Sequence, residues 1–207
     1  MTAVSYELSV FATPWHWFVH GLGMGQNRDG FDAARAARIS ELARTVAHHR
    51  AGRFPSFVAE LVDTIVAACD PADGGEPGRA ASARLTERIS GLHDARDHAR
   101  ACAAAVESLV KLGRMPPGDH ALRRELAAAR DRIAALPAPT DQARYGNLQL
   151  LANLVVAGAQ ADWPEALGPA QLAAAAQLVA PIDDFFYHAR GQALWQTVVG
   201  IVEPRAR

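Results

Sequence analysis

The chain has 207 residues and a mass of 22.1 kDa, a size that suits one domain with a substantial hydrophobic core. Half of the residues are apolar and 21% are charged, as in soluble globular proteins. The formal net charge of -1 gives no general attraction to nucleic acid or to an anionic membrane. No stretch reaches the roughly 20 uninterrupted apolar residues of a membrane span. We therefore expect neither nucleic acid nor a membrane as a partner.

The N-terminus and the cysteines bear on where the protein is located. The chain does not start with basic residues followed by an apolar run, so the pattern does not predict a signal peptide. Cys69 and Cys102 are the only cysteines, and they are far from any CxxC spacing. We expect two reduced thiols, with a disulfide as the alternative, and a cytoplasmic location.

Helical spacing of apolar residues dominates the chain, and strand signals are nearly absent outside residues 4–11. Loops rich in Gly and Pro divide the chain at 23–30, 69–78, 114–119, 136–141 and 162–169. The pattern predicts a single all-α domain over residues 1–207, with about eight antiparallel helices in a bundle or a small α/α barrel-like layout. Residues 69–79 are predicted to form a flexible loop.

The first expected helix contains His16, Trp17 and His20. On a helix the two imidazoles project from one face, one turn apart, and this spacing can hold zinc or iron when a third ligand is present. Neither an HExxH arrangement nor the Glu-x-x-His pairs of di-iron bundles accompany them. We therefore expect no metal and no cofactor. We interpret the three residues as walls of a ligand pocket, with a metal site as the alternative.

The segment 80–112 presents an apolar face into which Arg96 is predicted to project. A guanidinium does not lose its proton, so a buried Arg96 needs an anion, from a ligand or from an aspartate of the chain. The same segment contains HDARDH at 93–98, in which Asp94 stands four residues before His98. This resembles metal-ligand spacing. We interpret it instead as weak pairs on a solvated surface, because Asp94 and His98 are predicted to point away from the apolar face.

Two later segments, 145–160 and 181–202, contain hardly any charge suited to a solvated face, so we expect them to be the inner helices. The segment 119–136 has one narrow apolar seam with charged residues around it, which predicts an outer helix. Gln149 and Asn153 form part of an amide stripe on the first inner segment. Buried amides need partners, so the stripe either orients a ligand or bonds neighbouring backbone.

The last of these segments carries ionisable residues and Trp195 among its apolar residues. Asp184 and His188 stand four residues apart, so the carboxylate is placed to orient the imidazole and raise its basicity. Asp183 and Arg190 lie on a second face of the expected helix. The alternative role for the aspartates is an N-terminal cap that stabilises the start of the helix.

No GxGxxG, P-loop or GxSxG motif occurs, so nicotinamide chemistry, P-loop phosphoryl transfer and triad hydrolysis are not expected. Ionisable side chains on apolar helices lower the stability of the fold, so their presence indicates that they have a functional role. We predict a small helical enzyme of bacterial specialised metabolism that acts on a small organic, anionic molecule by cofactor-independent acid–base chemistry. The reaction would be an elimination, cyclisation or isomerisation.

In this hypothesis His188, oriented by Asp184, moves the proton, and Arg96 stabilises negative charge. The remaining expected ligand contacts are Trp17, His16, His20, Gln149, Asn153, Asp183, Arg190 and Trp195. The alternative is a non-catalytic helical protein, either small-molecule-binding or a partner subunit, whose interior polar groups are structural. Its helical surface would then form a homo- or hetero-oligomer.

Overall fold

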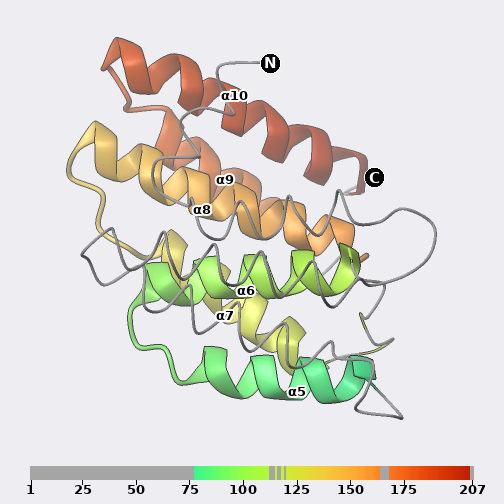
Figure 1. Ribbon diagram of the computed structural model, residues 1–207. Coiled ribbons are helices and arrows are strands. Elements are labelled where there is room, and N and C mark those ends of the chain that lie inside the picture. Colours follow the sequence, from blue (N-terminus) through green and yellow to red (C-terminus); the bar gives the residue numbers. More distant parts are fainter. Residues whose placement is uncertain (1–76, 112–114, 116–117, 119, 164–167, 206–207) are drawn as a thin grey trace, which may run out of the picture. The chain divides into compact units, whose positions relative to one another are not determined.

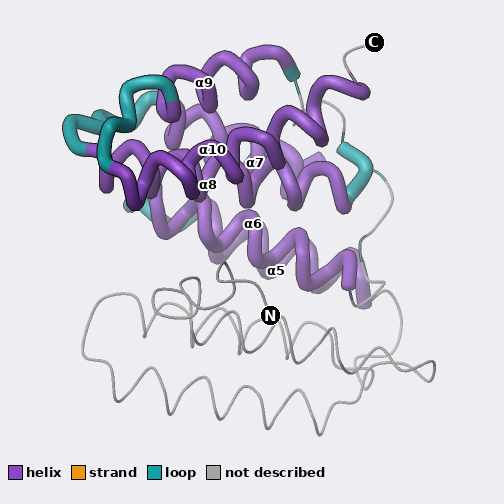
Figure 2. The backbone as a smooth tube through the Cα atoms, turned by 90° about the horizontal axis from the view of Figure 1, so that it is seen from above, coloured by secondary structure: helices purple, strands orange, loops and turns teal. Residues whose placement is uncertain are grey.

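The computed structural model describes residues 77–111, 115, 118, 120–163 and 168–205 (Figure 1). Within these ranges the chain forms α-helices, one short 3-10 helix and loops, and no strand (Figure 2). The predicted all-α class is confirmed for this part of the chain. The helices are α5 (Pro77–Ser90), α6 (Ala95–Lys111), α7 (His120–Ala134), α8 (Asp141–Gln160), α9 (Pro169–Val179) and α10 (Phe185–Val202), followed by η3 (Glu203–Arg205).

The chain divides into two compact units, residues 1–88 with 107–119, and residues 89–106 with 120–207. Most described helices belong to the second unit, and the expectation of a single domain stays a prediction. The aromatic and histidine cluster predicted at His16, Trp17 and His20 lies outside the described residues, as does most of the predicted loop. The end of that loop, residues 77–79, belongs to α5. No helix within the described ranges is long and apolar enough to cross a membrane.

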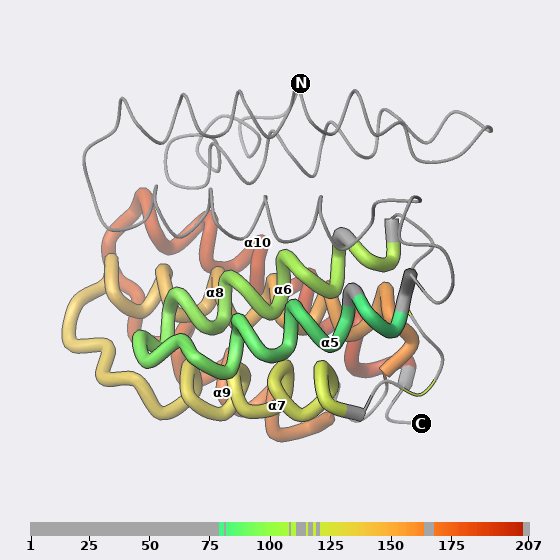
Figure 3. The backbone as a smooth tube through the Cα atoms, turned by 60° about the horizontal axis from the view of Figure 1, so that its bottom comes forward, coloured from blue at the N-terminus to red at the C-terminus, as the bar shows by residue number. Residues whose placement is uncertain are grey.

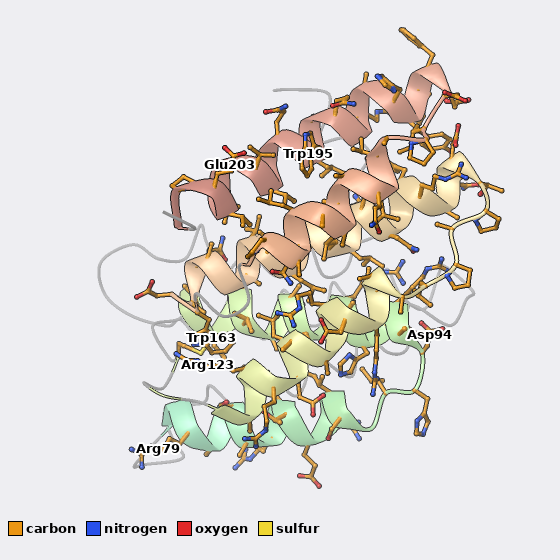
Figure 4. All side chains as sticks on the ribbon, turned by 180° about the vertical axis from the view of Figure 1, so that it is seen from behind. Arg79, Asp94, Arg123, Trp163, Trp195 and Glu203 are labelled. Carbon is orange, nitrogen blue, oxygen red and sulfur yellow. The ribbon has the colours of Figure 1, made fainter. Side chains whose placement is uncertain are left out.

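A break that the sequence pattern missed separates α5 from α6. The Oδ1 atom of Asp94 accepts hydrogen bonds from the backbone amides of Arg96 at 2.9 Å and Asp97 at 3.0 Å, so it caps the start of α6. Asp94 is labelled at this start in Figure 4. The segment 80–112 is therefore two helices, and a facial assignment made for one continuous helix does not hold across residues 91–94.

α8 is the central helix of the second unit. It contacts α7, α9 and α10 (Figures 1 and 3). Its buried residues are Asn147, Leu148, Leu150, Leu151, Ala152, Leu154, Val155, Ala157 and Gly158. The prediction of an inner helix over 145–160 is confirmed. α7 buries the predicted seam, with Leu122, Leu126, Ala129 and Ile133 at 1% exposure or less.

α10 does not match its predicted inner position. It packs on α8 and α9, yet its buried residues are only Gly191, Val198 and Val202. Gly191 permits this packing, because a Cβ atom there would lie 3.2 Å from Ile182 and 3.3 Å from Val179. The remaining residues of α10 are exposed or half-buried. Absence of charge predicted burial on all sides, whereas the helix buries one edge.

Local motifs define both ends of α8. The hydroxyl of Thr140 accepts a hydrogen bond from the amide of Ala143 at 3.2 Å and caps the start. At the other end Asp162 takes a left-handed conformation with φ 55°, and the amide of Trp163 donates to the carbonyl of Gly158 at 2.9 Å. Trp163 is then buried beneath the guanidinium of Arg123, 5.3 Å from the ring centroid (Figure 4).

Candidate functional site

The N-terminal turn of α10 contains most of the predicted catalytic residues. Asp184 is the N-cap: its Oδ1 atom accepts hydrogen bonds from the amides of Phe186 at 2.9 Å and Tyr187 at 3.2 Å. This confirms the capping alternative for one of the two aspartates. The Asp184 carboxylate is thereby engaged with backbone amides, so it does not have the orienting role toward His188 that the spacing predicted.

The imidazole of His188 is held by a different group. Its Nδ1 atom lies 2.9 Å from the carbonyl oxygen of Ile182. A carbonyl oxygen only accepts, so Nδ1 carries the proton and Nε2 carries the lone pair in the neutral ring. His188 is exposed. The geometry therefore presents a basic nitrogen of fixed tautomer toward solvent, at the surface of the protein and not within a dry interior.

A carboxylate of α8 holds the loop that precedes α10. The Oδ2 atom of Asp141 accepts hydrogen bonds from the amides of Asp183 at 3.1 Å and Asp184 at 2.9 Å, and its Oδ1 atom accepts from Arg144 at 2.7 Å. The amide of Asp184 is the largest cause that lowers the pKa of Asp141 below its usual value of 3.8, and Arg144 lowers it further. Asp183 and Asp184 therefore meet α8 through their backbone, and both side chains are exposed.

Aromatic side chains gather beside these groups. The rings of Tyr145 and Tyr187 have centroids 5.5 Å apart, and Phe186 meets Tyr187 edge to face at 5.1 Å. The Arg190 guanidinium stacks 3.4 Å from the Phe186 ring centroid. Phe185 is 90% exposed and Phe186 is 49% exposed. We call these five residues the aromatic patch. The expected inner position of the segment 181–202 did not single out these two phenylalanines, since no local signal distinguishes a buried phenylalanine from an exposed one.

Arg96 is exposed and donates a hydrogen bond to the Oδ1 atom of Asn147 at 3.2 Å. Asn147 in turn donates from Nδ2 to the carbonyl of Leu136 at 3.3 Å and is fully buried. The prediction that Arg96 projects into an apolar face is therefore wrong. The guanidinium reaches an amide of α8 and not an aspartate.

The predicted amide stripe is mostly outside the interior. Asn153 is exposed and Gln149 is half-buried, as is Trp195 on α10. Asn147, two residues before Gln149, is a fully buried amide of α8 that the predicted stripe did not include. The described contacts do not bring Arg96, Asn153 and His188 together around one point, so the ligand site expected from these residues stays a prediction.

A buried polar cluster lies where a solvated surface was predicted. His98 is fully buried, and its Nε2 atom is 2.8 Å from the Oε2 atom of Glu125 on α7. The Sγ atom of Cys102 lies 4.0 Å from the same nitrogen. The prediction that His98 points to solvent is wrong, because α6 is enclosed on several faces: His98, Ala99 and all of residues 101–106 are buried.

This cluster has the residue types of nucleophilic catalysis but not the arrangement. A triad engages the two ring nitrogens with different partners. Here Glu125 and Cys102 both approach Nε2, while Nδ1 of His98 is buried without a hydrogen-bonding partner. Burial, with the charge of Glu125 as a smaller cause, raises the pKa of Cys102. The sulfur is therefore held as a thiol, which is a poor nucleophile.

The geometry of the cluster supports a structural link between α6 and α7. Among the described residues, no group of three or more His, Cys, Asp or Glu side chains is arranged to hold a metal ion. Comparison of the chain with protein-family models, with curated proteins and with solved structures found no match.

Proposed function

We propose that this chain is a partner-binding helical protein that docks another protein surface through α10. The observation that carries this proposal is the exposure of Phe185, at 90%, and Phe186, at 49%, on the first turn of that helix. Singly exposed apolar residues are ordinary, but adjacent phenylalanines with a stacked arginine have the composition of interface anchors. The partner-subunit alternative of the sequence hypothesis is therefore the one that we favour.

The rest of α10 supports the same proposal. No charged residue or histidine occurs from Gly191 to Val202, although most of these residues are exposed or half-buried. The neighbouring α9 also lacks charged residues. On α7, by contrast, the exposed positions include Arg124, Asp131 and Arg132. A solvent-facing helix normally carries charged residues on its exposed side, as α7 does. The scarcity of charge on the exposed sides of α9 and α10 therefore supports a surface that another protein covers.

Site-specific photo-crosslinking tests the proposal. A benzophenone amino acid in place of Phe185, in full-length protein irradiated in the native cell, should give an adduct of discrete mass. The matched control carries the same amino acid in place of Arg124, an exposed position on α7, and should give none. Equal labelling at both positions, or none at position 185, would show that α10 is not a docking surface.

The second candidate function is the predicted enzyme that acts on a small organic, anionic molecule by cofactor-independent acid–base chemistry. One observation favours it: the carbonyl of Ile182 fixes the tautomer of His188 and leaves Nε2 available to take a proton. In this version Asp184 stabilises the helix on which His188 stands and does not touch the imidazole. In this candidate Arg190 and Arg96 would be the cations that hold an anionic substrate group.

A genetic comparison separates the two candidates. A strain without the gene is complemented with the unaltered chain, with His188→Gln, or with the Phe185→Ala/Phe186→Ala double variant. If the enzyme candidate is right, the strain complemented with His188→Gln should accumulate an unconverted small molecule, and the strain complemented with the double variant should not. The partner-binding proposal requires that the double variant fails while His188→Gln restores the strain.

The finer fold prediction also stands as a proposal. We infer about eight antiparallel helices in one cytoplasmic domain. The arrangement of α7, α8, α9 and α10 in the second unit supports a layered helical array.

A further inference from the structure

We draw no further inference here: the strongest candidate, the exposed surface patch around Phe185 and Phe186 at the start of α10, belongs to the docking surface already proposed, and nothing in the described part of the structure shows what covers it.

Discussion

The neighbouring helices α8 and α10 contact each other and are both rich in apolar residues, yet α8 buries nine residues and α10 buries three. α8 is enclosed because α7, α9 and α10 all pack on it. α10 packs on α8 and α9 and leaves much of its surface exposed. The difference teaches that apolar content alone does not determine how much of a helix the described fold buries.

The largest expected effect on the free energy of unfolding comes from a pair of leucine truncations, one in each helix. Leu151→Ala in α8 removes a fully buried side chain and should lower the free energy of unfolding by about 2–5 kcal/mol. Leu194→Ala in α10 removes a half-buried side chain and should cost less than about 1.5 kcal/mol. Urea denaturation at low protein concentration measures both. Equal costs would place α10 in the core.

The buried His98–Glu125 pair tests what holds α6 to α7. Glu125→Ala leaves His98 with only the long 4.0 Å contact between Nε2 and the Sγ atom of Cys102, and should cost about 1–3 kcal/mol of unfolding free energy. Glu125→Gln retains an acceptor and should recover most of that loss. The same urea titration gives both values, and an unaffected Glu125→Ala chain would contradict the structural role assigned to the pair.

The two glycines of α10 test its inner and outer faces within one helix. Gly191→Ala forces a methyl group against Ile182 and Val179 and should destabilise the fold by about 1–3 kcal/mol. Gly200→Ala meets open space and should raise the stability of the monomer by about 1 kcal/mol. Thermal and urea unfolding of dilute protein measure the two changes.

Gly146→Ala in α8 provides the matched control for the outer glycine. A Cβ atom at Gly146 also meets nothing within 4 Å, so this substitution should stabilise by a similar amount. Gly200→Ala and Gly146→Ala should therefore raise the free energy of unfolding alike, because neither added methyl group meets a neighbour. A clear loss of stability with Gly200→Ala alone would contradict the open space at this position.

The smallest expected effect concerns the contact that joins α8 to the start of α10. The pKa of Asp141 is lower in the folded protein than its usual value of 3.8, so the folded state binds fewer protons than the unfolded state between the two values. The stabilisation is therefore complete above about pH 4 and is lost as the pH falls through the folded pKa. Asp141→Asn should remove this pH dependence, as urea midpoints from pH 7 to pH 2 will report. A parallel pH profile in both chains would contradict the assignment.

Periodicity was sufficient where charged residues mark the solvent side. The seam of α7 and the interior position of α8 followed from the pattern, because Arg, Asp and Glu delimit one helix and are absent from most of the other. The capping role of Asp184 was also among the expectations, since helix starts are local in sequence.

The remaining features depend on contacts between distant segments. His98 is buried because Glu125 reaches it from α7, and Asn147 is buried because Arg96 and Leu136 bond it from both sides. The exposed side of α10 was missed for another reason. An uncharged helix is compatible with burial by its own chain or by another, and a single sequence does not distinguish the two.

The hydrogen bonds of Asp141 give the surface helix a connection to the core. The amides that precede α10 are held by a carboxylate in the first turn of α8, so fraying at the start of α10 releases the start of α8 as well. The two helix starts therefore open as one cooperative unit, which amide hydrogen exchange would detect as shared protection. Any protein that docks on the aromatic patch would slow this opening and so stabilise the central helix from outside.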